Sequence, residues 1–328
     1  MNGGEKAGLR LWLLNNTSLV LFLIVVVAFS ILAPAFRQPQ NAFNILLQSS
    51  STGILAVGMT FVLLTAGVDL SVGAVMFVAG AVAGKLALGG MGVGALMGTM
   101  LAVGAAYGAM NALFITRLGI VAFVVTLATN YFGRGLGFNI TKVRSLNLPE
   151  GFYELGAARL LGIPAPVLIF AGVAVVAHLT LTRTPFGRQL HALGADINAA
   201  RKAGINTRGI LFVTYVICAV CAAIAAIVAL SQAPSVDPTF GRNREFLAIA
   251  AAVLGGASLF GGRGSVLPGT VLGAVLIQTI ENGLNILNVN PYAYPIITGS
   301  IIFVAILTDA IRTGLLAKLT RRKIFVEG

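Results

Sequence analysis

Long apolar runs recur along this chain and restrict what it can fold into. Residues 18–36 and 210–230 carry no charged side chain, and each is long enough to cross a bilayer, which takes ~20 predominantly apolar residues. Only 10% of the 328 residues are charged, against about 25% in soluble domains, and the mean hydropathy is +0.94. The sequence therefore predicts an all-α polytopic integral membrane protein.

We identify about ten membrane spans from these runs, with both termini in the cytoplasm because the basic loops and tail then lie inside. The eighth run is short and ends among glycines, so we expect some spans to be short or broken. Residues 1–328 are predicted to form a single membrane domain with a basic cytoplasmic tail at 311–328. The predicted spans are residues 18–36, 43–66, 70–89, 92–116, 120–140, 166–181, 210–230, 246–260, 266–284 and 294–310.

Small residues at four-residue spacing indicate close helix packing in lipid. The net charge of +12 belongs to membrane topology rather than to nucleic-acid binding. Cys218 and Cys221 lie one helical turn apart within a span, and we interpret them as packing residues rather than zinc ligands. The spaced glycines are Gly80/Gly84, Gly90/Gly94/Gly98, Gly104/Gly108 and Gly269/Gly273.

The chain lacks an internal energy source. The segment before Lys85 resembles a phosphate-binding loop, but Ala79 replaces its first glycine and Leu86 its hydroxyl residue. No metal-binding or catalytic cluster is apparent, and ionisable residues within the spans are too sparse to favour ion coupling. An ion-coupled carrier working alone and a non-transporting scaffold remain the alternatives to a transporter driven by a partner ATPase.

One polar basic segment, residues 184–208, lies between two apolar runs. A short helix is predicted near 195–204, with Asp196 as its N-cap, Arg201 and Lys202 at its C-terminal end, and Gly204 after it. Ile197 with the neighbouring alanines gives a small apolar face. That face fits a groove on a soluble protein as well as it fits a lipid surface.

Two groups of polar residues inside the spans are candidates for a site. Asp69 is predicted either to cap the third span by accepting from the amides near Ser71 and Val72, or to act in a gate, with Gly67 and Gly73 allowing a sharp break. A second group is predicted either to line a pathway or to hydrogen-bond between helices. It comprises Asn130, Tyr131 and Arg134, and Gln278, Glu281, Asn282 and Asn285, of which the last four share one helical face.

Three motifs resemble the permease subunits of ATP-binding cassette importers of the ribose, xylose and arabinose group. They are AVGMT at 56–60 followed by GVDLSVG at 67–73, LGADINAARKAGI at 193–205, and VLGGASLFGGRG at 253–264, which continues to ENGLN at 281–285. They occur in the order of the family, from about residue 53 to the last span. The sequence departs at Leu247, where many relatives carry Asp, so no role of that acid is transferred.

The resemblance implies a bacterial inner-membrane importer that moves a monosaccharide or sugar-like solute by alternating access. The implied partners are ATP-binding subunits that hold the ATP and Mg, a second permease chain, and a periplasmic or lipoprotein receptor; the chain itself is expected to bind no cofactor. Gly67, Asp69, Ser71 and Gly73 of the motif at 67–73 are expected to form a gate or a structural motif. The residues expected to couple to the ATPase are Ala195, Asp196, Asn198, Ala199, Ala200, Arg201, Lys202, Gly204 and Ile205.

Overall fold

The computed structural model describes residues 17–294, 296–297, 299–300, 303 and 307. The described residues form two compact units, one drawn from the ranges 1–42 and 276–328 and one of residues 43–275. Both are mostly helical in the described part of the chain. The predicted single domain over residues 1–328 stays a prediction.

Four helices of the described residues are long and apolar enough to cross a membrane. They match the second, fourth, sixth and seventh predicted spans. These helices are α3 (Pro39–Leu64), α5 (Val93–Thr116), α8 (Ala165–Arg183) and α11 (Thr207–Gln232). The fifth predicted span is α6 (Ala122–Thr141), and the third is α4 (Val72–Ala87).

The eighth and ninth predicted spans are short or interrupted helices. Helix α12 (Arg244–Leu254) has 11 residues, or about 16 Å at 1.5 Å per residue, so the eighth span is short as its glycines predict. The ninth begins as an irregular turn, η2 (Val266–Thr270), in which Leu267 has extended dihedral angles, and continues as α13 (Val271–Ile286). The span at 294–310 lies largely, and the tail at 311–328 wholly, outside the described residues. The total of ten spans therefore stays a prediction.

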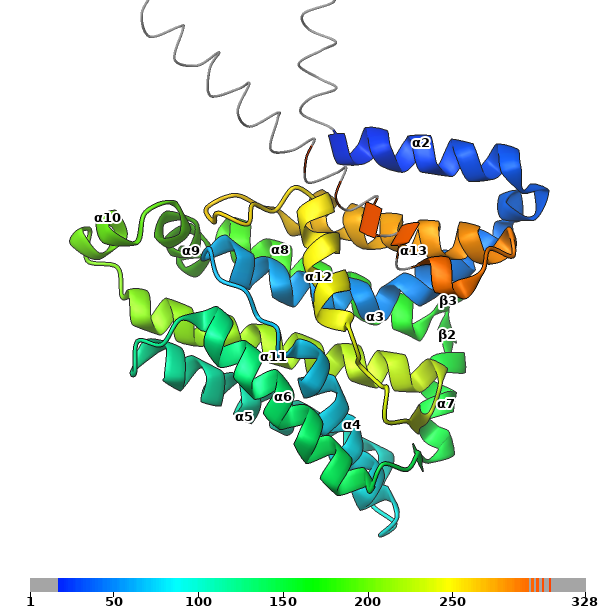
Figure 1. Ribbon diagram of the computed structural model, residues 1–328, viewed down its shortest axis with the longest axis horizontal. Helices are drawn as coiled ribbons and strands as arrows, with labels where there is room; N and C mark the ends of the chain where they lie inside the picture. The colour runs from blue at the N-terminus through cyan, green and yellow to red at the C-terminus, as the bar shows by residue number, and fades with distance from the viewer. Residues whose placement is uncertain (1–16, 295, 298, 301–302, 304–306, 308–328) are drawn as a thin grey trace, which may run out of the picture. The chain divides into compact units, whose positions relative to one another are not determined.

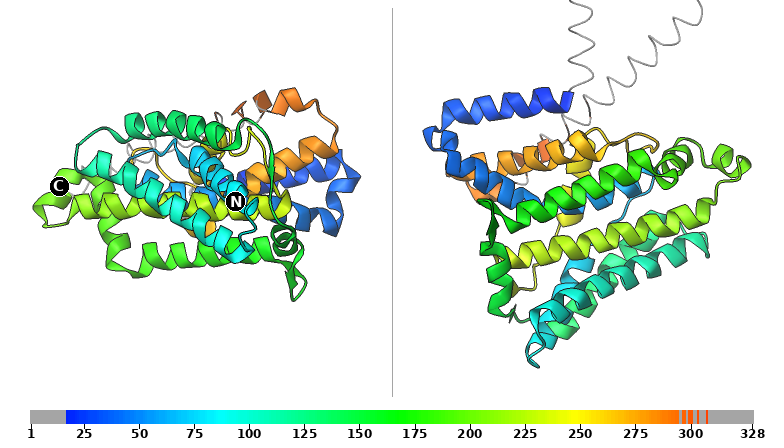
Figure 2. Two further views of the ribbon diagram at one scale, coloured as in Figure 1. Left: turned by 90° about the horizontal axis from the view of Figure 1, so that it is seen from below. Right: turned by 180° about the vertical axis from the view of Figure 1, so that it is seen from behind.

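Helix α4 forms the core of the larger unit. Twelve of its 16 residues are buried, because α5, α6 and α11 all pack against it (Figures 1 and 2). Burial on every side explains why its sequence is continuously apolar rather than amphipathic.

Glycine allows several of these helices to approach closely. A Cβ added at Gly104 would lie 2.8 Å from the Ala219 carbonyl on α11, and one at Gly58 would lie 2.7 Å from Cβ of Cys221. Cys218 and Cys221 are free and buried at this contact. Gly90, Gly94 and Gly98 have no atom of the described residues within 4 Å of an added Cβ, so their packing role stays a prediction.

Short elements gather at the two ends of α11 (Figure 1). One end carries α9 (Pro185–Ala195) and α10 (Ile197–Lys202), and the other carries α7 (Glu150–Ala157) with two antiparallel strand pairs. The pairs are β1 (Leu146–Asn147) with β4 (Ser235–Val236), and β2 (Arg159–Leu160) with β3 (Ile163–Pro164). The sequence does not predict them, because two-residue strands are too short to show an alternating pattern.

The described part of the smaller unit contains α2 (Thr17–Leu32), η1 (Pro34–Arg37), part of α13 and η3 (Pro291–Ala293). The ring centroids of Phe29 and Phe36 lie 5.6 Å apart. A Cβ at Gly283 of α13 would lie 2.5 Å from the Phe29 ring, so this glycine is needed for close packing within the unit.

Candidate functional site

A tight turn joins α3 to α4 and contains Asp69, which is fully buried. Its Oδ1 accepts hydrogen bonds from the backbone N–H of Ser71 at 2.9 Å and from the Ser71 hydroxyl at 2.6 Å. Nδ2 of Asn111 on α5 donates to the same hydroxyl at 2.8 Å. The N-cap of α4 is Ser71 rather than Asp69. Ser71 already has helical dihedral angles. The Asp69 carboxylate therefore accepts from the N–H of the N-cap residue itself, and so stabilises the turn that precedes the helix.

The glycines of this turn serve packing rather than a sharp bend. The positive φ falls on Ala66, at 59°, and neither Gly67 nor Gly73 has one. A Cβ at Gly67 would lie 2.6 Å from the Tyr215 hydroxyl, and one at Gly73 would lie 2.5 Å from Oε2 of Glu245. The expectation that these glycines supply the break is therefore wrong, and their place in the motif reflects close approach of neighbouring groups.

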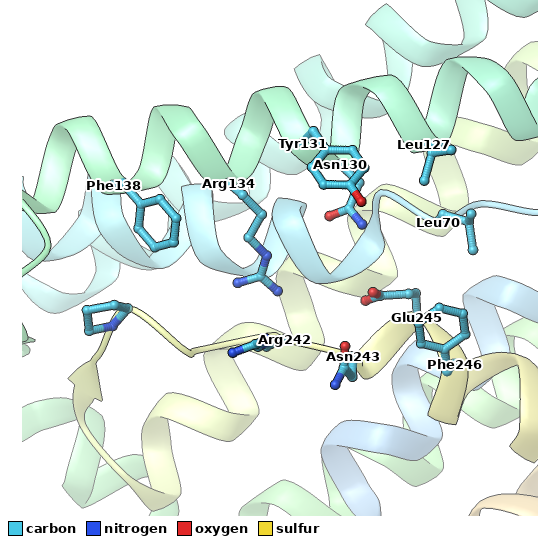
Figure 3. Close-up of a pocket in the computed structure, with 11 residues that line it drawn as sticks. Leu70, Leu127, Asn130, Tyr131, Arg134, Phe138, Arg242, Asn243, Glu245 and Phe246 are labelled. Atoms are coloured by element: carbon cyan, nitrogen blue, oxygen red, sulfur yellow. The ribbon is translucent and has the colours of Figure 1, made fainter. Parts of the chain in front are cut away.

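A cavity of about 420 Å³ lies in the larger unit (Figure 3). Three predicted pathway residues, Asn130, Tyr131 and Arg134, line it from α6. The other lining residues come from four segments. They are Leu70 in the turn before α4, Leu127 and Phe138 on α6, Pro238, Arg242 and Asn243 in the loop between β4 and α12, and Glu245 and Phe246 in the first turn of α12. Tyr131 is 74% exposed, so this wall is accessible from the surface of the unit.

Arg134 joins α6 to the loop before α12. Its Nη1 donates a hydrogen bond to the carbonyl oxygen of Phe240 at 2.6 Å, and its guanidinium lies 5.4 Å from the centroid of the Phe77 ring. The aromatic face and the carbonyl hold one side of the guanidinium in place. Its Nη2 is buried and has no hydrogen-bond partner among the described residues.

Glu245 is the principal site residue that sequence reasoning misses. It directly precedes the predicted span at 246–260, and in the structure it lies in the first turn of α12 and is only 5% exposed. Its carboxylate points toward Arg134 across the cavity (Figure 3). A carboxylate is stabilised at a helix N-terminus. The signal that could have identified it is an acid directly before an apolar helical run.

The four polar candidates on α13 belong to the smaller unit. Gln278 and Asn282 are buried, Glu281 is partly exposed and Asn285 is exposed. The predicted shared face is therefore divided between the interior of the unit and its surface. Burial of Gln278 and Asn282 fits the alternative of hydrogen bonding between helices.

The basic segment contains two helices, and α10 is capped as predicted. Oδ1 of Asp196 accepts hydrogen bonds from the backbone N–H groups of Asn198 at 2.8 Å and Ala199 at 3.0 Å. Arg201 and Lys202 occupy the last turn, and Gly204 follows with a φ of +79°. This local geometry confirms the predicted helix.

The sequence predicts that Ala200 is part of the exposed apolar face of α10. The structure shows that it is not. It is 3% exposed, and its carbonyl accepts a hydrogen bond from the backbone N–H of Ile205 at 3.1 Å. The returning chain, together with α9 and α11, covers this side of the short helix. The exposed apolar face therefore consists of Ile197, which is 40% exposed, with Ala199 and Ala203.

Helix α9 is a separate element rather than an extension of α8. Thr184 ends α8 and starts α9, where its hydroxyl accepts a hydrogen bond from the N–H of Gly187 at 3.3 Å and Pro185 follows at the first helical position. Helix α9 is therefore a second helix in the basic segment, before the predicted short one. Ala195 ends α9 and Asp196 starts α10, so one residue separates the two helices.

The end of α9 packs against two distant segments, the end of α3 and the glycine-rich loop after α12. Gly262 in that loop donates from its N–H to the Leu64 carbonyl at 3.0 Å, and Nδ1 of His191 lies 3.1 Å from the Gly262 carbonyl oxygen. A Cβ at Gly194 would overlap the Leu64 carbonyl and lie 2.6 Å from the Gly262 nitrogen. We call this contact of Gly194, Leu64 and Gly262 the α9 junction.

The described residues contain no group of three His, Cys, Asp or Glu side chains that could hold a metal ion. The polar groups of the cavity are instead a carboxylate, a guanidinium and an amide. Such a set can form hydrogen bonds with a solute.

A family model described as "Branched-chain amino acid transport system / permease component" matches residues 41–306. The ribose import permease of Escherichia coli K12 is 38% identical over 93% of this chain and 97% of its own length. The ribose import permease of Bacillus subtilis 168 is 37% identical over 88% and 90%, and the D-allose transport system permease of E. coli K12 is 36% identical over 91% and 92%. No solved structure matches the chain. The chain belongs to this family of permease components of ATP-binding cassette importers.

Proposed function

We propose that this chain forms the membrane pathway through which an importer moves a monosaccharide or sugar-like solute across the bacterial inner membrane. Relatives named as permeases for ribose, D-allose and galactofuranose support a sugar as the solute. A separate subunit would bind and hydrolyse ATP. A second permease chain and an external solute receptor would complete the assembly, with both termini of this chain in the cytoplasm.

The observation that carries the proposal is the α9 junction. Force applied to α10 reaches α9 across a single residue, and α9 contacts both Leu64 and the Gly262 loop. Leu64 is the last residue of α3, five residues before Asp69. The Gly262 loop follows α12, whose first turn contains Glu245.

Both routes from the junction lead to the cavity. The turn after α3 ends near Leu70, which lines the cavity on one side, and α12 contributes Glu245 and Phe246. A docked ATPase that shifts α10 would therefore move two cavity walls by displacing one junction. Alternating access requires this kind of two-state linkage between nucleotide state and pathway.

The basic turn of α10 is the surface that we propose docks on the ATPase subunit. Arg201 and Lys202 are exposed, with Ile197 beside them. The double variant Arg201→Glu, Lys202→Glu is expected to abolish receptor-stimulated ATP hydrolysis and uptake while the chain still inserts. A charge-preserving control, Arg201→Lys with Lys202→Arg, should retain both activities.

The assay uses the purified assembly in proteoliposomes, with loaded receptor added on one side and ATP on the other. Normal coupling in the charge-reversed protein would refute docking through α10. Uptake by the wild-type chain without ATP or an ATPase subunit would instead support the ion-coupled alternative and refute the proposed function as a whole.

A further inference from the structure

Three polar atoms around the cavity are buried and have no hydrogen-bond partner among the described residues. They are Oε2 of Glu245, Oδ1 of Asn130 and Nη2 of Arg134. All three residues line the cavity, and the side chains approach one another from α6 and α12 (Figure 3). Leaving a buried polar group unpaired is costly, so three such groups at one cavity are typical of a site that a ligand completes.

The donor and acceptor types of these atoms restrict the ligand. The carboxylate and amide oxygens need hydrogen-bond donors, whereas the guanidinium nitrogen needs an acceptor. A carboxylate or phosphate ligand offers no donor to the first two, and an ammonium ligand offers no acceptor to the third. A hydroxyl group both donates and accepts, so a solute with several hydroxyls satisfies all three atoms.

The rest of the lining suits a small ring. The rings of Tyr131, Phe138 and Phe246 provide apolar faces beside the polar cluster, and aromatic faces suit the C–H surface of a sugar as well as other apolar groups. A volume of about 420 Å³ is within the usual range for small-molecule sites, ~300–1,000 Å³.

Gly73 keeps the polar cluster free of side-chain atoms from α4. A Cβ at this position would lie 2.5 Å from Oε2 of Glu245 and 3.3 Å from Nη2 of Arg134, and it would overlap the Gly241 carbonyl. Both unpartnered charged atoms therefore lie beside the α4 backbone, in a space that only glycine leaves unfilled.

We propose that Glu245, Arg134 and Asn130 form a binding site for the hydroxyl groups of a neutral monosaccharide inside the permease. The inference rests on the proposed function, because it places the transported solute at this cavity. It adds a selection step after the receptor. The site accepts neutral polyhydroxyl solutes and disfavours sugars whose hydroxyls are replaced by phosphate or carboxylate.

The first test separates solute passage from ATPase coupling. Glu245→Gln and Arg134→Gln are each expected to lower uptake by about 10- to 100-fold, the effect of losing one hydrogen bond to a charged group. Receptor-stimulated ATP hydrolysis should stay within about twofold of wild type. Glu154→Gln, which changes an exposed acid on α7, is the matched control and should leave uptake unchanged.

The second test measures binding at the site by protection of a cysteine from labelling. It can be carried out with a protein that no longer transports. A Tyr131→Cys variant is labelled with a polar maleimide in inside-out and right-side-out membranes, because Tyr131 is exposed at the cavity while Cys218 and Cys221 are buried. D-Ribose, D-allose and galactose at high concentration are the probes, with ribose 5-phosphate as the charged comparison. At least one neutral sugar should slow labelling, the phosphate should not, and Glu245→Gln in the same background should remove the protection.

The outcomes distinguish the two proposals. Normal uptake by Glu245→Gln and Arg134→Gln, or equal protection by the neutral and phosphorylated sugars, overturns the binding site and leaves the importer function intact. Failure of the wild-type assembly to couple ATP hydrolysis to uptake overturns the function instead. If the Glu245 or Arg134 variants do not assemble, labelling of Tyr131→Cys with those residues unchanged still tests the proposal. Absence of protection by all three neutral sugars would overturn the binding site.

Discussion

Substitution of Gly194 by alanine tests whether the α9 junction connects α10 to the cavity. A methyl group there would lie 2.6 Å from the Gly262 nitrogen and would overlap the Leu64 carbonyl oxygen. Ordinary van der Waals contact begins at 3.4 Å, so the Gly262 nitrogen would have to move by roughly 0.8 Å, the difference between the two distances. The three nearest atoms all belong to the backbone of Leu64 and Gly262, so a change of rotamer cannot move them away.

The expected strain follows from the same contacts. Overpacking of a close-packed interior costs ~1–3 kcal/mol, and loss of the 3.0 Å hydrogen bond between Gly262 and Leu64 adds ~0.5–1.5 kcal/mol. Together these ranges give about 1.5–4.5 kcal/mol, which corresponds to a shift of roughly 10- to 2,000-fold toward a junction whose contacts are broken. We therefore expect uptake per ATP hydrolysed to fall by about tenfold or more.

The assay compares the thermal midpoint, receptor-stimulated ATP hydrolysis and solute uptake of the purified assembly. Gly172→Ala on α8 is the matched control, because an added Cβ there has no neighbour within 4 Å. Alanine also favours a helix over glycine by up to ~1 kcal/mol. If Gly194→Ala has the wild-type midpoint and the wild-type ratio of uptake to hydrolysis, the junction does not transmit motion.

Two further predictions concern Asp69 and α10. Asp69→Asn retains an oxygen that can accept hydrogen bonds from Ser71. It should transport better than Asp69→Ala, which is expected to lose ~1–3 kcal/mol of stability. Equal uptake defects of the two variants at equal expression would show that the charge itself is required. Ala200→Leu should lower the thermal midpoint by overpacking, whereas Ala199→Leu should leave the midpoint unchanged and weaken retention of the ATPase subunit on purification. The reverse pattern would contradict the burial of Ala200.

Sequence patterns predict the long helices and the local structure of α10. Charge-free runs are sufficient for α3, α5 and α11 because lipid and helix neighbours both select apolar residues. The ends of α10 could be predicted because Asp196 and Gly204 satisfy backbone groups within the same turn. These features depend on residues close together in the chain.

Features set by distant contacts could not be predicted in this way. The burial of Ala200 depends on α9, α11 and the returning chain, and the role of Gly194 depends on Leu64 and Gly262. Glu245 has the sequence context of an ordinary loop acid, and only the approach of α6 makes it part of a cavity. Asn130 and Arg134 were found because polar groups within an apolar run are costly and therefore conspicuous.

The central position of α4 has a consequence for how the protein is made. Its 16 residues span ~24 Å, less than the ~30 Å hydrocarbon core, and the buried Asp69 lies just before it. Synthesis from the N-terminus delivers α4 to the membrane before α5, α6 and α11, the helices that enclose it. Because α11 begins 120 residues after α4 ends, stable enclosure of α4 is a late event in biogenesis. A chain truncated before α11 should leave it as the segment most readily recognised by membrane quality control.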